Sequence, residues 1–255
     1  MNNTPVMYSP KEMEQLQNHI TTTFGTPGDF LAHEITSEYV HTDVQVCHDQ
    51  NIRHLVTFGM SARAMQSPLP DFQRTELVMS VSDSFDLMSR EGGVLLGELT
   101  ELTKYPFRND TWFGHGHTVA ASKAFREMFG YDAWLLLDFQ EDAFHLDDGG
   151  EIHFLQAIPI YMDERDWIME NDSVLYFKFL YDAFGDGAVL VNSGREHLLP
   201  DEETAALYGL LSVLGTDKKT LQDLQTYLEK MEETGEDVSY EMIENWLQEH
   251  GSVAE

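Results

Sequence analysis

The sequence is nearly devoid of cysteine, and Cys47 is the single thiol among its 255 residues. One thiol cannot form an internal disulfide, and it leaves no cysteine pair that could hold a metal ion. Cys47 lies in an alternating segment that is typical of a strand, so we interpret it as a reduced, structural thiol. Such a thiol favours a reducing compartment, and we expect the protein to be cytoplasmic.

Long apolar runs are also missing. No stretch of the sequence approaches the length of about 18 consecutive apolar residues that indicates a membrane-spanning helix. The N-terminal segment has neither a basic start nor an apolar centre, so we do not expect it to be a secretory signal. These two absences predict a protein that works without a membrane.

Basic side chains are scarce, since 15 Lys and Arg residues stand against 45 Asp and Glu residues, a formal net charge of −30. This charge repels nucleic acid and anionic membrane surfaces, so neither is expected as a partner. Two interpretations of the charge stay open. It either keeps the protein soluble, or it speeds the encounter with a basic protein partner.

The catalytic signatures that a single sequence can reveal are missing as well. There is no GxSxG nucleophile elbow, no GxxxxGK(S/T) phosphate loop, no GxGxxG after a strand and no HExxH pair. We therefore predict no catalytic residue, no cofactor and no resident metal. A binding protein is the expected class, and an enzyme is not.

What the sequence does contain is enough apolar material for a folded core. Hydrophobic residues make up 42% of the chain and aromatic residues 11%, far from the composition of a disordered chain. Alternating or continuous apolar runs predict strands, and they occur at 40–46, 55–58, 76–81, 133–139 and 152–161. Residues 133–139 and 152–161 are expected to pair in antiparallel orientation.

Helices are predicted where apolar residues recur at helical spacing. The first begins at Pro10, with Ser9 as its cap and Glu12 closing a capping box, and ends at Gly25. A second is expected over 91–105 and is ended by Pro106. Residues 108–121 are expected to form a loop. A third helix begins at Asp163 and carries Trp167, Val174, Leu175 and Phe179.

The composition changes after about residue 190. From Asp201 onward the chain has 14 acidic and three basic residues, a net charge of −11. Apolar stripes predict three short helices there. They span 205–214, the segment marked by Leu221, Leu224, Leu228 and Met231, and the segment marked by Met242, Ile243, Trp246 and Leu247. Each stripe packs either on the body of the protein or against a partner.

The segment from Trp112 to His117 invites a metal-site interpretation. His115 and His117 are two residues apart, which places both imidazoles on one side of an extended chain, as in some zinc sites. Further ligands could come from His33, Glu34, His41, Asp43 or Asp110, although no spacing in the sequence brings them together. The alternative is a glycine-rich turn whose imidazoles hydrogen-bond the backbone.

Three short segments are specific enough to compare with known families: Gly59-Met60-Ser61, the W-x-G-x-G-H-T segment from Trp112, and the Q-x-I-P-x-Y segment from Gln156. With Thr42-Asp43-Val44, Leu55 to Phe58, Glu76-Leu77, Tyr105-Pro106 and Ala133 to Leu137, they occur in a characteristic order. In this order they resemble the Suppressor of fused (SUFU) domain family over residues 25–185.

The resemblance implies an α+β (mixed α/β) fold, in which helices flank a twisted mixed β-sheet, and a protein-binding role without catalysis. We expect residues 1–190 to form the SUFU-like domain and 191–255 an acidic, all-helical extension. Animal members hold transcription factors of the Hedgehog pathway inactive, but they carry a larger C-terminal domain, so that role is not carried over. Bacterial members are considered immunity proteins, which implies inhibition of a toxin, here one with a basic domain.

The segments that match the family supply the candidate partner contacts. These residues are Met60, Tyr105, Trp112, Phe113, His115 and His117. For the apolar residues among them the alternative role is core packing. Two other functions stay open: a metal-dependent enzyme that uses His115 and His117, and a homo-oligomeric scaffold that assembles through the C-terminal apolar stripes.

Overall fold

The structure is a computed structural model that describes residues 5–35, 37–140, 142–147 and 150–201. In the C-terminal part it describes residues 204–205, 223–224, 226–227, 230–231, 242 and 246. The chain divides into two compact units, Met1–Leu199 and Pro200–Glu255. Within these described ranges, no helix combines the length and the apolar character that crossing a membrane requires.

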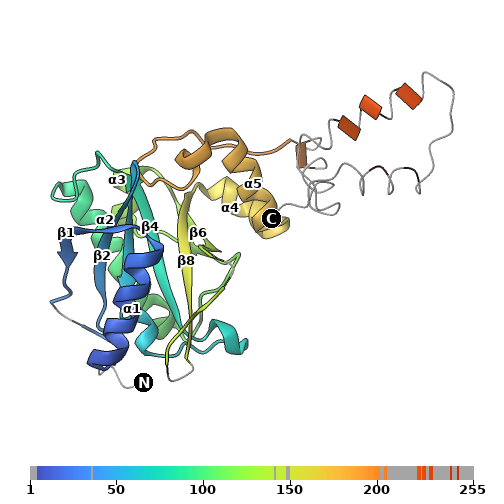
Figure 1. Ribbon diagram of the computed structural model, residues 1–255. Coiled ribbons are helices and arrows are strands. Elements are labelled where there is room, and N and C mark those ends of the chain that lie inside the picture. Colours follow the sequence, from blue (N-terminus) through green and yellow to red (C-terminus); the bar gives the residue numbers. More distant parts are fainter. Residues whose placement is uncertain are drawn as a thin grey trace. The chain divides into compact units, whose positions relative to one another are not determined.

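The first unit is built on an open mixed sheet with the strand order β1-β2-β3-β4-β8-β6-β5 (Figure 1). The strands are β1 (Thr26–Ala32), β2 (Asp43–Asp49), β3 (Ile52–Phe58), β4 (Thr75–Ser82), β5 (Thr118–Ala120), β6 (Ala133–Asp138), β7 (Phe144–His145) and β8 (Glu151–Ile160). Strands β4 and β8 run parallel, and every other pair is antiparallel. The predicted α+β fold with a mixed sheet is confirmed.

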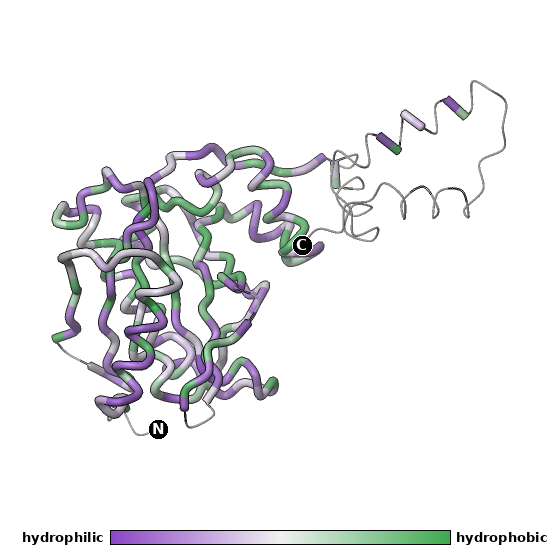
Figure 2. The backbone as a smooth tube through the Cα atoms, viewed as in Figure 1, coloured by the Kyte–Doolittle hydropathy of each residue, from purple (hydrophilic) through white to green (hydrophobic). Residues whose placement is uncertain are grey.

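Helices cover both faces of this sheet (Figure 1). Helices α2 (Arg90–Asn109) and α3 (Lys123–Phe129) share one core cluster with β2, β3, β4, β6 and β8. The opposite face packs against α1 (Pro10–Thr23) and against α4 (Met162–Glu170) with α5 (Ser173–Phe184). Because both faces are covered, inner strands are apolar on both sides, and Figure 2 shows hydrophobic residues along them.

The strand alternation assigns each residue to one of the two faces. Leu55 and Leu77 lie in the cluster under α2, whereas their neighbours Val56 and Val78 lie in the cluster under α1. A shift of one residue in register would exchange these two sets. The register of the sheet is therefore set by burial on both faces.

The predicted N-terminal helix is confirmed in detail. The hydroxyl of Ser9 accepts a hydrogen bond from the backbone N–H of Glu12, and the Glu12 carboxylate accepts one from the N–H of Ser9. Leu16 and Ile20 are buried against the sheet. The cap fixes where α1 begins, and the apolar stripe fixes which side faces the core.

The prediction that Pro106 ends its helix is wrong, because α2 continues to Asn109. Proline lacks the N–H that would bond the preceding turn, a loss that usually breaks a helix. Here Leu102 and Phe107 are buried in the core cluster on either side of Pro106, so tertiary packing offsets the lost bond. The helix ends at Asp110, which adopts a left-handed conformation with φ 52°.

Other expected boundaries differ from the structure. The single helix expected from Asp163 is two helices, because Asp172 caps a new one by accepting a hydrogen bond from the N–H of Leu175 at 2.7 Å. The expected loop 108–121 contains the last residues of α2 and the strand β5. Strand β1 and helix α3 were not predicted.

In the second unit, the described residues that fall in the three predicted helices are all helical. Leu224 is buried, and the rings of Tyr227 and Trp246 stack with their centroids 5.8 Å apart. This contact brings the second and third predicted helical segments together within the unit. Most of segment 205–214 lies outside the described residues, as do Leu221, Leu228, Ile243 and Leu247.

Candidate functional site

The Gly59-Met60-Ser61 segment wraps around a buried carboxylate, that of Glu76 on β4. Glu76 Oε1 accepts hydrogen bonds from the backbone N–H groups of Gly59 at 2.8 Å and Ser61 at 3.0 Å. Its Oε2 accepts one from the hydroxyl of Thr57 at 2.6 Å, and the Ser61 hydroxyl also donates to Oε1. Burial raises the pKa of Glu76, and these hydrogen bonds act in the opposite direction.

The same segment is fixed by backbone shape and by packing. Gly59 adopts φ 120°, and a Cβ there would lie 2.1 Å from the carbonyl oxygen of His41, so only glycine fits. Met60 is 1% exposed and lies in the same core cluster as Val44 and Leu77. The structure therefore places Met60, a candidate partner contact, in the core, where a partner cannot reach it.

Aromatic packing shapes the segment that starts at Trp112. Phe113 is 2% exposed, and its ring stacks on Tyr105 with centroids 5.8 Å apart. The half-buried ring of Trp112 lies edge-on to His117 at 4.3 Å. A Cβ on Gly114 would lie 2.4 Å from the Trp112 ring, so glycine lets this ring fold back over the chain. Phe113 is a core residue, whereas Trp112 and Tyr105 stay accessible.

The two histidines of this segment serve different contacts. Nδ1 of His115 lies 3.0 Å from Oδ2 of Asp138 and 3.2 Å from the Asp138 backbone nitrogen. The carbonyl of His117 accepts a hydrogen bond from Leu136, and partial burial lowers the pKa of its imidazole. Neither histidine belongs to a group of three metal-ligating side chains in the part of the chain that the structure describes.

Three of the other candidate ligands do come together. His33, His41 and Asp43 place nitrogen and oxygen donors within 4.8 Å of one another at the start of β2. Glu34 instead pairs with Lys104, whose Nζ lies 2.7 Å from Glu34 Oε1. Asp110 caps α2. The structure thus separates the predicted ligands, because His33, His41 and Asp43 meet at β2 whereas His115 and His117 lie in the turn before β5.

Strand β5 is one edge of the sheet. Backbone hydrogen bonds to the neighbouring β6 segment are made by His117 and Ala121. The N–H and C=O groups of the alternate residues Thr118 and Ala120 therefore point away from β6. Such an edge can accept another extended chain as an added strand.

Exposed apolar and aromatic side chains lie on both sides of this edge. On the α4 side, Met162 and Met169 are exposed, and the Met169 sulfur accepts a hydrogen bond from the Thr118 hydroxyl at 3.7 Å. On the α2 side, Tyr105 is 40% exposed. Methionine and tyrosine are adaptable contact residues at binding surfaces.

A pocket of about 210 Å³ opens between α2 and the end of β5. Its lining residues are Glu98, Glu101, Leu102, Tyr105, Arg108, Ala120 and Ser122. Oε1 of Glu98 accepts hydrogen bonds from Trp134 Nε1 and the Ser122 N–H, both at 3.0 Å. Its Oε2 is buried and has no hydrogen-bond partner within the described residues. Glu98 thus lines the pocket, whereas its unpaired oxygen is shielded from solvent.

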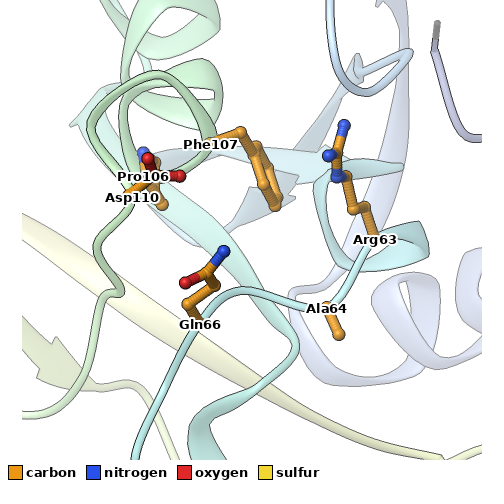
Figure 3. A pocket seen from close by; sticks show the side chains of 6 residues that line it. All are labelled: Arg63, Ala64, Gln66, Pro106, Phe107 and Asp110. Atoms are coloured by element: carbon orange, nitrogen blue, oxygen red, sulfur yellow. The ribbon is translucent and has the colours of Figure 1, made fainter. Parts of the chain in front are cut away.

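A second hollow is much smaller, with a volume of about 40 Å³ (Figure 3). Arg63 and Gln66 line it opposite Pro106, Phe107 and Asp110, and the Arg63 guanidinium lies 5.4 Å from the centre of the Phe107 ring. Small-molecule sites usually measure about 300–1,000 Å³. This hollow is about a fifth of the volume of the pocket beside β5 and is not a candidate ligand site.

The sequence analysis did not identify Glu98, although its position relative to the apolar residues of α2 is a signal. Glu98 lies three residues after Leu95 and four before Leu102, so it is on the apolar face of α2. A carboxylate on such a face is either paired or functional. Strand β5 carries no comparable signal, because three residues are too few to establish an alternation.

Comparison with known proteins gives a family match. A family model described as Suppressor of fused protein (SUFU) matches residues 38–195, more than half of the chain. This match confirms the resemblance identified from the sequence motifs. A search of curated protein sequences finds no match to this chain.

Two solved structures with TM-scores above 0.5 show the same fold. A chain of the Sufu–Fu complex crystal structure matches with a TM-score of 0.55 and 13% identity, over 74% of this chain and 92% of that chain. A Suppressor of fused homologue from Neisseria gonorrhoeae FA 1090 matches with a TM-score of 0.51 and 15% identity, over 76% and 100%. Drosophila Suppressor of Fused matches with a TM-score of 0.49 and 13% identity, over 74% and 47%.

Proposed function

Because this chain belongs to the Suppressor of fused protein family, we propose that it is a non-catalytic protein-binding module that holds an extended segment of a partner along β5. The likeness in fold includes a chain from a structure of a Sufu–Fu complex, which is a protein–protein assembly. The family supports binding as the general function.

The observation that carries the proposal is the pocket beside the edge strand β5, which is lined by the acidic residues Glu98 and Glu101 and by Tyr105. Glu101 already pairs with Arg108 at 3.1 Å, so a lysine or arginine of the partner would share Glu101 with Arg108. Glu98 and the Tyr105 ring favour the same kind of cationic side chain.

The edge strand gives the partner its direction and its register. Main-chain hydrogen bonds to Thr118 and Ala120 would align an extended segment with β5, and alternate side chains would then point to the two sides. One side offers the pocket with Glu98, and the other offers Met162 and Met169. A segment that alternates a basic and an apolar residue fits both.

The net charge of −30 supports a basic partner. Opposite charge speeds the encounter of two proteins, and salt weakens this steering. A basic toxin domain, inhibited when its cationic surface is occupied, is the partner class that this charge favours. Occupation of one surface by another requires binding alone, with no catalytic step by this chain.

The test is the selection of short peptides from a random library by the full-length protein. We expect enriched peptides with lysine or arginine next to apolar residues, and we expect their affinity to fall as salt rises. In the enriched set, Tyr105→Ala and Glu98→Gln should each weaken binding about tenfold, which corresponds to about 1.4 kcal/mol.

Tyr181→Ala is the matched control, because Tyr181 is 46% exposed and lies on α5, away from the pocket lining. Equal weakening by Tyr105→Ala and Tyr181→Ala would contradict the proposed site. Failure to enrich any basic peptide would contradict it as well. Mass measurements at several concentrations then test the alternative of a self-assembling scaffold.

A further inference from the structure

Three metal-ligating side chains meet where the loop after β1 joins β2. Nδ1 of His33 lies 2.8 Å from Oδ1 of Asp43, and Nε2 of His41 lies 3.3 Å from the same oxygen. Donor atoms of the three residues all lie within 4.8 Å of one another. Elsewhere in the described part of the chain, no other three histidine, cysteine or acidic side chains meet in this way.

We propose that His33, His41 and Asp43 bind a divalent transition-metal ion, with Zn²⁺ as the preferred ion. Two imidazoles and one carboxylate form a donor set typical of zinc. Metal–ligand distances of about 2.0–2.1 Å in tetrahedral geometry separate two donors by about 3.3 Å. The His41–Asp43 separation already has this value, and the exposed His33 can rotate slightly outward to reach it.

Neighbouring groups hold two of the ligands in the required orientation. The Ser37 hydroxyl lies 2.6 Å from Nδ1 of His41, which leaves Nε2 directed toward Asp43. The backbone N–H of Glu34 donates to Oδ1 of Asp43 at 3.1 Å. Supporting hydrogen bonds of this kind fix the ring orientation and tautomer of a metal ligand before the ion binds.

The side chain of Glu34 anchors the loop that carries the two histidines. Oε2 of Glu34 accepts a hydrogen bond from the N–H of Thr42 at 3.0 Å, and Oε1 pairs with Lys104 of α2 at 2.7 Å. Glu34 and Lys104 are both nearly inaccessible to solvent. The ends of the loop are thus set without a metal. Three protein ligands leave a fourth position for water, as in open zinc sites.

The test is a calorimetric titration of untagged, chelator-treated full-length protein with Zn²⁺ alone at pH 7.5. We expect uptake of one Zn²⁺ per chain and none of Mg²⁺, because Mg²⁺ prefers oxygen ligands. Co²⁺ in the same site should show the visible absorption of a nitrogen-containing coordination shell. The affinity should fall at pH 5.5, because the imidazoles must be neutral to bind.

The variants His33→Ala and Asp43→Asn remove one ligand each. Ser37→Ala removes only a supporting hydrogen bond, and such a loss should weaken Zn²⁺ binding about 10- to 100-fold. Loss of a ligand in His33→Ala or Asp43→Asn should weaken Zn²⁺ binding by more than this. His145→Ala is the matched control, since the side chain of His145 is 63% exposed against 65% for His33 and lies beside Glu151.

His33 is exposed, so its variant should fold even if Asp43→Asn does not. Wild-type protein that takes up no stoichiometric Zn²⁺ would overturn the proposal. So would equal Zn²⁺ affinity in the wild type and in His33→Ala, or an equal loss in His33→Ala and His145→Ala. These outcomes are independent of the peptide-binding result, so the metal site and the proposed function can fail separately.

Discussion

Glu76 shows how one buried side chain determines the shape of a loop. Its carboxylate accepts hydrogen bonds from the backbone of Gly59 and Ser61 and from Thr57, so the turn after β3 is built around it. The family motif Gly59-Met60-Ser61 therefore serves the fold. At this position the segment meets a structural requirement, and its Met60 side chain is buried.

We expect Glu76→Ala to lower the free energy of unfolding by about 4 kcal/mol, because two buried backbone N–H groups lose their acceptor at roughly 1–3 kcal/mol each. Glu76→Gln keeps one oxygen for these donors and should cost about 1 kcal/mol. Urea denaturation of both variants measures the difference. Similar losses in the two variants would show that the turn does not depend on the acceptor.

His54 makes stability depend on pH. Burial lowers the pKa of His54 below its ordinary value, so the folded state holds it neutral while the unfolded chain takes up a proton. The sign follows from proton linkage: stability falls as pH drops below about 6.5 toward the lowered value. His19 and His117 are shifted in the same direction by burial.

Replacing His54 with glutamine should therefore reduce the loss of stability between pH 7.5 and pH 5.5. Glutamine keeps a polar group for the Ser80 hydroxyl, which lies 2.9 Å from Nδ1 of His54. Urea denaturation at the two pH values measures the change. His145→Gln is the exposed control, and an equal change in both variants would argue against a contribution from burial.

At the scale of elements, the helix with several agreeing local signals was predicted correctly, and the elements with weak signals were not predicted. Helix α1 has a cap, a proline at its first position and an apolar stripe, and all three appear in the structure. Strand β1 contains Pro27 and Gly28 and pairs with an irregular register, so no alternation reveals it. Strand β5 and helix α3 are too short for periodicity to define.

Ser9→Ala should lower the free energy of unfolding by about 1 kcal/mol, since it removes the side-chain acceptor at the start of α1. Ser9→Asp keeps an acceptor there and places a negative charge at the helix N-terminus, so it should preserve the wild-type value. Thermal unfolding of the two variants distinguishes them. Wild-type stability in both variants would mean that packing of Leu16 and Ile20 alone determines where α1 begins.

At the scale of the whole molecule, the segment after residue 190 is bound to strand β4 and to helix α4. The N–H of Val191 donates to the carbonyl of Ser80 at 2.9 Å. The guanidinium of Arg195 lies 2.7 Å and 2.8 Å from the two carboxylate oxygens of Glu164, and both side chains are enclosed. The N–H of Leu198 also donates to Glu164.

Two truncations separate the contribution of this segment from that of the second unit. A chain of residues 1–194 lacks Arg195 and leaves Glu164 buried and unpaired, so it should be about 3–5 kcal/mol less stable than a chain of residues 1–199. Both lack the second unit, so urea denaturation of the pair isolates residues 195–199. Equal stability would show that the ion pair adds nothing to the fold.

The sequence by itself determined the capped helix α1, the apolar strands of the sheet centre, the strongly acidic charge and the family. These are local or additive properties, so neighbouring residues or a simple count suffice to specify them. Only the tertiary structure decided that Pro106 lies within a helix and that Met60 and Phe113 are core residues. Only the tertiary structure brings Glu98 beside β5 and His33 beside Asp43. The strand order and the path of the loops place these side chains together, and no periodic pattern in the sequence relates their positions.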